Sequence, residues 1–246
     1  MKKIIAHRGM SSLAPENTLS AFSLCEKYGV QWFECDVDIL QDGTVIVSHD
    51  DTLDRCTDQS GRLCDISRAD LEFIDAGSWF SDEFINERLP TIEQLITLAN
   101  EKKLNLNIEI KSCAVSAELS HLLIDNLILA LEKLHSDREI IVSSFNHLVL
   151  SEFKKKSPQT KVACLFESHN LWDDWNAIIE WCQADYIHPE EKGLTREMVK
   201  RFKASGIQVN VWTVNNLARA NELFNWGVDG ICTDIAHSFP SKYKLK

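Results

Sequence analysis

The sequence predicts an α/β fold, a single (β/α)8 barrel of the TIM type, on three observations. Its 246 residues match the length of one such barrel. Eight short apolar segments read as strands, and longer segments with helical periodicity separate them. A doubly wound open sheet is the alternative, but no glycine-rich dinucleotide loop follows the first expected strand, and eight repeats favour closure.

The expected strands alternate with the expected helices along the whole chain. The strands are expected at residues 3–6, 32–40, 104–111, 139–144, 161–166, 184–188, 208–214 and 230–233. Helices are expected at residues 15–27, 91–103, 117–135, 147–156, 171–182, 195–204 and 217–226.

An interruption follows the second expected strand. An Asp-Gly turn at residues 42 and 43 predicts a hairpin with a return strand at 44–48. The polar residues from about 49 to 90 read as an insertion into a single domain that spans residues 1–246.

Composition narrows the partners and the compartment. The net charge of −11 argues against a nucleic-acid or anionic-membrane partner, whereas a small anion can still bind where positive charge is local. The eight cysteines show no paired C-x-x-C spacing, and several lie in apolar segments, where free cysteine acts as a small hydrophobe. The N-terminal apolar stretch is too short for a secretory signal, and no run is long enough to span a bilayer. We therefore expect a reduced, cytoplasmic protein without stable membrane insertion.

Carboxylates gather where two expected strands end. Glu34 and Asp36 are two residues apart in one strand, so their side chains project to the same face, and Glu109 and Lys111 repeat this spacing on the next. The carboxyl ends of barrel strands converge on one face. The three carboxylates would repel one another there unless a cation neutralised them. Oxygen-only ligands favour Mg²⁺ or Ca²⁺. The alternative is a solvated rim with an ion pair to Lys111.

Two histidines and an arginine stand beside these carboxylates. His7 and His49 can exchange protons near neutral pH, and Arg8 offers a fork of donors suited to phosphate oxygens. A cation, a guanidinium, an ammonium and two imidazoles around one point suit the cleavage of a phosphodiester. Other histidines are expected to be structural: His121, His135, His147, His169 and His237.

Three further residues at strand ends are open to two interpretations. Trp212 and Phe145 either stack on a substrate or fill the barrel, because aromatic residues mostly serve burial. Glu167 is either a partner of the metal site or a charge on the rim.

The chain resembles the glycerophosphodiester phosphodiesterase family over nearly its whole length. The resemblance rests on a series of motifs in order: His7-Arg8-Gly9, Pro15-Glu16-Asn17-Thr18, Glu34-Cys35-Asp36-Val37, Asp42-Gly43-Thr44, His49-Asp50-Asp51-Thr52-Leu53-Asp54-Arg55, Leu89-Pro90-Thr91, Glu109-Ile110-Lys111, Val211-Trp212-Thr213-Val214-Asn215, Gly227-Val228-Asp229-Gly230-Ile231 and Thr233-Asp234. One departure is Cys56-Thr57, where the family often has two threonines.

The resemblance implies a barrel that hydrolyses glycerophosphodiesters to glycerol 3-phosphate and an alcohol with one divalent metal. Attack by the neighbouring glycerol hydroxyl would give a cyclic phosphate that water then opens. The insertion would cover the site, with Trp79 and Phe80 as a wall for the glycerol. The family's functional residues correspond here to metal ligands Glu34, Asp36 and Glu109, acid and base His7 and His49, phosphate-binding Arg8, and Lys111 beside the third ligand.

Two rival functions stay open. A related barrel phosphodiesterase could act on lysophospholipids in the manner of a phospholipase D, with an apolar groove formed by the insertion. A barrel that binds a phosphate metabolite without turnover is the rival from a different class, but binding alone does not require paired acid and base groups. The leaving alcohol is open among choline, ethanolamine, glycerol and inositol.

Overall fold

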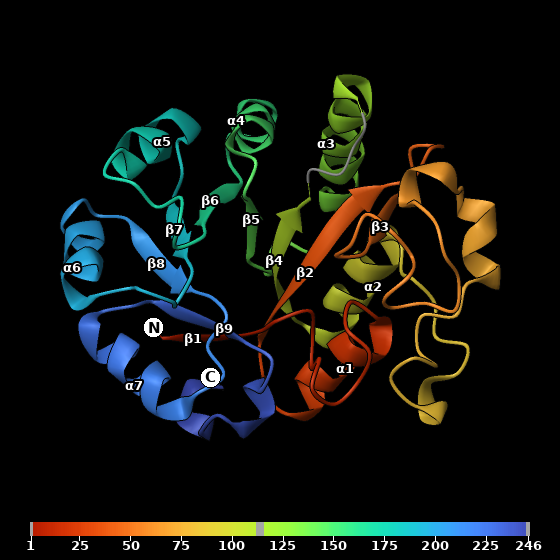
Figure 1. The fold of residues 1–246 in the computed structure, drawn as a ribbon, viewed down its shortest axis with the longest axis horizontal. Helices are drawn as coiled ribbons and strands as arrows, with labels where there is room; N and C mark the ends of the chain where they lie inside the picture. Colours follow the sequence, from red (N-terminus) through yellow and green to blue (C-terminus); the bar gives the residue numbers. More distant parts are fainter. Residues whose placement is uncertain (1, 112–115, 245–246) are drawn as a thin grey trace.

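Eight parallel strands close into a barrel that is surrounded by helices. The computed structural model describes residues 2–111 and 116–244. The strand order is β1-β9-β8-β7-β6-β5-β4-β2, and β1 also pairs with β2, which closes the ring (Figure 1). The fold is therefore the predicted TIM barrel, with one extra strand, β3, on the edge of β2.

The observed elements follow the predicted alternation. The strands are β1 (Lys3–Ala6), β2 (Trp32–Ile39), β3 (Val45–Val47), β4 (Asn105–Ile110), β5 (Ile140–Ser144), β6 (Lys161–Phe166), β7 (Tyr186–Pro189), β8 (Gln208–Val211) and β9 (Gly230–Thr233). The α-helices are α1 (Leu19–Lys27), α2 (Ile92–Lys102), α3 (Ala117–Leu131), α4 (His147–Lys156), α5 (Trp175–Cys182), α6 (Arg196–Ala204) and α7 (Leu217–Trp226).

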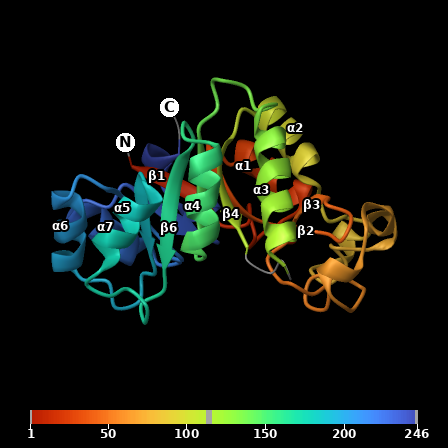
Figure 2. The ribbon, with the colours of Figure 1, turned by 90° about the horizontal axis from the view of Figure 1, so that it is seen from above.

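The insertion lies against β2 and β3 at one side of the barrel (Figure 2). It contains three short 3-10 helices, η1 (Leu63–Asp65), η2 (Arg68–Phe73) and η3 (Asp82–Phe84). It has its own apolar cluster, in which Leu53, Leu63 and Leu71 pack on Leu40 and Ile46 from the hairpin. The hairpin therefore anchors the insertion beside the end of β2. Two further 3-10 helices, η4 (Ala236–Ser238) and η5 (Ser241–Tyr243), follow β9.

Helix α1 begins later than its sequence pattern predicted. Thr18 has extended backbone angles, and its side-chain oxygen accepts a hydrogen bond from the amide of Ala21, which makes Thr18 the N-cap. Asn17 has a φ of 58°, a left-handed conformation that cannot continue a right-handed helix. Residues 15–17 are therefore a loop, and that loop reaches the site described below.

Three other predicted elements were too long. Helix α3 ends at Leu131, because Asn100 of α2 binds the carbonyl of Lys133 and the amide of His135 and so takes those groups out of a helix. Helix α5 begins at Trp175, after two turn residues, and β8 ends at Val211, where Trp212 makes only an isolated bridge. Apolar periodicity extends past an element wherever a loop residue also packs on the core.

Membrane-spanning helices and disulfides are absent from the described residues. None of the helices in residues 2–111 and 116–244 is both long and apolar enough to cross a bilayer. The seven described cysteines are all free; Cys113 lies outside the described residues.

The pleat of β2 separates the apolar core from the interior of the barrel. Phe33, Cys35 and Val37 face the surrounding helices and are fully buried, whereas the residues between them face inward. The ring of Phe33 packs on Phe22 of α1 with centroids 4.6 Å apart. This outer layer holds the barrel and its helices together, which leaves the inward positions available for polar side chains.

Replacing Phe33 by alanine tests this layer. We expect Phe33→Ala to lower the free energy of unfolding by about 3–5 kcal/mol, because a fully buried ring leaves a cavity between β2 and α1. Phe73→Ala is the matched control, since Phe73 is 71% exposed, and it should stay within about 0.5 kcal/mol of the parent. Chemical denaturation of both variants measures the difference; equal losses would contradict the assignment of Phe33 to the core.

Candidate active site

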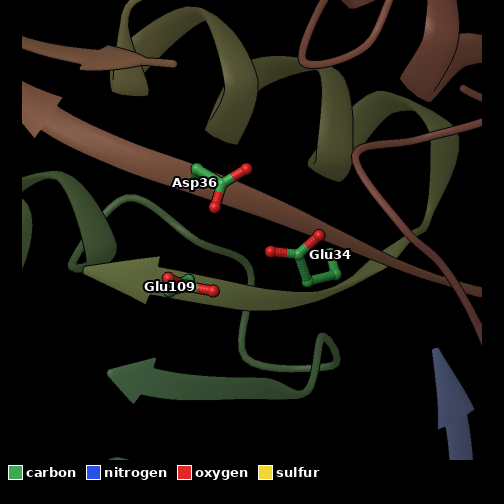
Figure 3. Close-up of side chains that lie close together, drawn as sticks. All are labelled: Glu34, Asp36 and Glu109. Atoms are coloured by element: carbon green, nitrogen blue, oxygen red, sulfur yellow. The ribbon is translucent and has the colours of Figure 1, made fainter. Parts of the chain in front are cut away.

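Three carboxylates from two neighbouring strands point toward one another (Figure 3). Glu34 and Asp36 come from β2 and Glu109 from β4, and the parallel register places Asp36 directly opposite Glu109. One oxygen of each carboxylate lies within 4.8 Å of one oxygen of the others. Glu34 and Asp36 are buried, and Glu109 is 9% exposed. The sequence expectation that these three residues gather is confirmed.

The cluster holds more negative charge than its own surroundings neutralise. Burial and the neighbouring Asp36 raise the pKa of Glu34 to about 8. The same two causes raise the pKa of Glu109 to about 7, against the opposing effect of Lys111. Burial also opposes ionisation of Asp36, but Arg8 and Lys111 outweigh it and hold the pKa of Asp36 below its usual value. A site of this kind favours a bound cation.

Two basic side chains border the carboxylates. Lys111 Nζ lies 2.9 Å from Glu109 Oε1 and 3.6 Å from Asp36 Oδ1. Arg8 Nε lies 3.3 Å from Asp36 Oδ2, and Arg8 Nη1 donates to Glu16 at 2.7 Å. No hydrogen bond from the described residues engages the remaining Nη2 of Arg8. Both residues line the cavity, so both can meet an anionic ligand there.

The backbone at Arg8 and Gly9 explains the opening motif. Arg8 has a φ of 54°, and its amide donates to Glu34 Oε2 at 3.0 Å. Gly9 has a φ of 81°, and a Cβ there would lie 2.8 Å from the backbone of Ala21. Only glycine therefore permits this close approach of α1, which keeps the turn after β1 directed at the carboxylates.

Each of the two predicted histidines is held by a carboxylate. His7 Nδ1 lies 2.6 Å from Asp234 Oδ1, and His49 Nδ1 lies 2.6 Å from Asp50 Oδ1. A carboxylate can only accept, so Nδ1 carries the proton in each ring and Nε2 is the atom left to act. His7 Nε2 lies 4.0 Å from Glu34 Oε2, and both histidines line the cavity.

The surroundings shift the pKa values of the two histidines in opposite directions. Burial alone would lower the pKa of His7, but Asp234 and Glu34 outweigh it, and that pKa is raised. Burial lowers the pKa of His49, and Arg8 and Lys111 add to this effect. The surroundings therefore favour the protonated form more strongly for His7 than for His49.

The cavity has a charged side and an apolar side. It encloses about 130 Å³ above the end of the barrel. Phe145, Leu165 and Trp212 give the cavity an apolar lining, and the rings of Phe145 and Trp212 meet edge to face at 5.3 Å. Trp212 Nε1 donates to the carbonyl of His188 at 2.9 Å, which fixes its ring. Polar residues complete the floor: Asn107, Ser143, His188 and Asn210.

Three residues considered from the sequence lie outside the cavity lining. Glu167 is 45% exposed in its side chain and lies 3.3 Å from the exposed His169, so the rim interpretation is correct. Trp79 and Phe80 pack on each other edge to face and Phe80 on Phe84, within the insertion. Neither ring lines the cavity, so the cavity does not support the expectation that they form a wall for the glycerol.

Several site residues had no role assigned from the sequence. Asn17 donates to Asp36 Oδ2 at 2.9 Å, and Glu16 accepts from Arg8. Asp234 holds His7, and Asn215 Nδ2 donates to Asp234 Oδ2 at 2.5 Å. Asp234 stands at the end of the last strand, and that position was the available signal. The others lie on loops, and only the folded chain brings them to the site.

The residues present fit a hard divalent cation. The donor set contains only carboxylate oxygens, which Mg²⁺ and Ca²⁺ prefer, and the oxygens are close enough to share one ion. Burial and the neighbouring Asp36 disfavour the ionised forms of Glu34 and Glu109, and a cation held between the three carboxylates would offset both effects.

The fold and the site define a barrel enzyme with a pocket for an anionic substrate. A sequence model described as the glycerophosphoryl diester phosphodiesterase family matches residues 7–237. The chain belongs to this family, and it is therefore a phosphodiesterase.

Relatives of known description match over almost their full length. A glycerophosphodiester phosphodiesterase of Caldanaerobacter subterraneus is 35% identical over 94% of this chain and 93% of its own. One from Bacillus subtilis is 29% identical over 97% of this chain and 86% of its own. A phosphodiesterase of Oleispira antarctica, solved with the product sn-glycerol-3-phosphate, superposes with a TM-score of 0.91 and 30% identity; the match covers 96% of this chain and 94% of that one.

The carboxylate cluster should make the metal-free protein sensitive to alkaline pH. Glu34 and Glu109 ordinarily titrate at 4.5, and in the folded state their pKa values rise to about 8 and about 7. The folded state therefore binds these protons more tightly than the unfolded state does. The folded state is favoured most below pH 4.5, and this advantage is lost as the pH rises through 7 and 8. We expect the unfolding free energy in chelator to fall between pH 5 and 8 by on the order of a few kcal/mol.

Chemical denaturation of the wild type and of Glu34→Gln at four pH values in this range measures the effect. The variant lacks one titrating group and relieves Glu109 of a neighbouring charge, so its stability should change less with pH. Parallel curves for the two proteins would contradict the prediction.

Proposed function

We propose that the protein hydrolyses glycerophosphodiesters to glycerol 3-phosphate and an alcohol. The observation that carries this proposal is the pair of carboxylate-held histidines that line one cavity with Arg8, Lys111 and the carboxylate cluster. Mere binding of a phosphate would not need two imidazoles with fixed tautomers. The product bound to the Oleispira antarctica neighbour supports the same substrate class.

Glu34, Asp36 and Glu109 would hold one divalent metal, Ca²⁺ or Mg²⁺. When bound, the cation supplies positive charge that polarises a phosphoryl oxygen and offsets the charge that develops on it. Arg8 and Lys111 would bind the remaining phosphate oxygens from the same side of the cavity. Trp212 and Phe145 would form the apolar wall against which the glycerol carbons rest.

His49 and His7 would act as base and acid in the first step. His49, whose pKa is lowered by burial, is assigned as the base: it accepts the proton of the glycerol hydroxyl next to the ester as that oxygen bonds to phosphorus. His7, whose pKa is raised by Asp234 and Glu34 against the effect of burial, is assigned as the acid: it gives a proton to the alcohol oxygen as the bond from phosphorus to that oxygen breaks. The products of this step are the free alcohol and a cyclic glycerol phosphate.

The second step reverses the roles of the two histidines. His7, now neutral, takes a proton from water as the water oxygen bonds to phosphorus. His49, now protonated, returns its proton to the glycerol oxygen as the ring opens, which gives glycerol 3-phosphate and restores both rings. Asp234 and Asp50 keep the two rings in place throughout, because their hydrogen bonds to Nδ1 do not depend on the step.

Release of glycerol 3-phosphate from glycerophosphocholine tests the function and its dependence on metal. We expect turnover with added Mg²⁺ or Ca²⁺, loss of at least about 100-fold after chelation, and recovery on re-addition, because the uncompensated carboxylates otherwise repel the phosphate. An enzyme-coupled assay for glycerol 3-phosphate measures it. Full activity after exhaustive chelation would contradict the metal site. If no tested diester gave glycerol 3-phosphate, the rival function, a barrel that binds a phosphate metabolite without turnover, would be favoured.

A long-chain lysophospholipid is the comparison substrate for the water-soluble glycerophosphocholine. The apolar residues of the insertion, such as Phe73 and Ile85, do not line the cavity, so we expect glycerophosphocholine to be hydrolysed faster. The opposite order would favour the phospholipase D-like function.

Removal of His49 tests the acid and base roles. We expect His49→Ala to lower kcat by roughly 10²–10⁴-fold, because the first step loses its base. The thermal unfolding midpoint should stay near that of the wild type, since the ring is one third exposed. Replacement of the exposed His169 by alanine is the matched control and should keep full activity. A His49→Ala protein with unchanged kcat would refute the mechanism.

A further inference from the structure

Arg55 joins the two sides of the site from outside the cavity. Its Nε donates to Asp50 Oδ2 at 2.6 Å, and its Nη2 donates to Asp50 Oδ1 at 3.1 Å. The other edge of the guanidinium donates to Glu16, from Nη1 to Oε2 at 2.9 Å and from Nη2 to Oε1 at 2.7 Å. One planar group therefore grips two carboxylates in a bidentate manner, which fixes their relative orientation.

Each of these carboxylates holds a different residue of the active site. Asp50 accepts from His49 Nδ1, whereas Glu16 Oε1 also accepts from Arg8 Nη1 at 2.7 Å. The result is one unbroken chain of charged contacts from His49 to Arg8. It spans the insertion, which carries Asp50 and Arg55, and the loop before α1, which carries Glu16.

Arg55 lies outside the cavity that the catalytic candidates line. It lines a separate small cavity behind His49 and is absent from the lining of the main one. Its side chain is 46% exposed, whereas that of Glu16 is 14% exposed and that of Asp50 25%. An exposed ion pair usually contributes little to stability. Two bidentate contacts from one guanidinium nevertheless restrict the relative orientation of Asp50 and Glu16 far more than a single ion pair would.

We propose that Arg55 is a positioning residue that fixes the His49–Asp50 pair relative to Arg8, through Asp50 on one edge and Glu16 on the other. Lysine cannot take this role, because a single ammonium has no planar fork to hold two carboxylates at once. The proposal rests on the proposed function for its effect on turnover, but the contact that it describes is independent of turnover.

A double-mutant cycle with Asp50 tests the assignment. We expect Arg55→Ala and Asp50→Asn each to lower kcat for glycerophosphocholine by about 10–100-fold, the usual effect of removing a supporting partner. Because Arg55 acts on His49 through Asp50, the double variant should lie within about threefold of Asp50→Asn alone. Arg62→Ala, an exposed arginine of the same insertion, is the matched control and should keep the wild-type kcat.

Arg55→Lys separates geometry from charge and guards against misfolding of the alanine variant. It keeps the positive charge, and we expect it still to lose most of the kcat. A wild-type kcat in Arg55→Ala or Arg55→Lys, or a double variant that shows the full product of the single losses, would overturn the proposal.

Imidazole ¹⁵N NMR gives a readout that does not need turnover. The His49 signals, identified by their loss in His49→Ala, should show a ring protonated at Nδ1 in the wild type and a mixture of tautomers in Arg55→Ala. Unchanged signals in Arg55→Ala would refute the positioning role. An inactive wild-type enzyme with the expected NMR change would instead refute the proposed function and leave the contact intact.

Discussion

Crowded negative charge at the ends of β2 and β4 is the constraint on which the rest of the site depends. Glu34, Asp36 and Glu109 cannot all ionise in a buried space without cations around them. Arg8 and Lys111 neutralise part of this negative charge. Arg8 contacts Asp36, and Lys111 contacts Glu109. Two hydrogen bonds tie the loop before α1 to this cluster: Asn17 donates to Asp36, and Glu16 accepts from Arg8.

The same constraint divides the barrel mouth into two halves. The carboxylates, Arg8 and Lys111 come from β1, β2 and β4 or from the residues just after them, whereas Phe145, Leu165 and Trp212 come from β5, β6 and β8 or from the residues just after them. A substrate with one anionic end and one carbon skeleton can satisfy both halves at once.

Much of this arrangement could be predicted from the sequence, because it follows from the alternation of strand residues. Glu34 and Asp36 share a face, Phe33 takes the other, and adjacent strands bring Glu109 alongside. Contacts between loops could not be predicted in this way. Arg55 pairs with Glu16, and Asn215 with Asp234, only because the tertiary fold brings loops that are distant in sequence together. Helix ends were misplaced for a similar reason, since Asn100 binds backbone groups of a different helix end.

The closure of the barrel by its first and last strands has a consequence for biosynthesis. β1 pairs with β9 over four residue positions, and His7 meets Asp234 across 227 residues of chain. A nascent chain emerges from its N-terminus, so β1 can pair with β9 only after all of the elements between them have been translated. A chain that is stalled or truncated before Asp234 would carry His7 without the carboxylate that orients it.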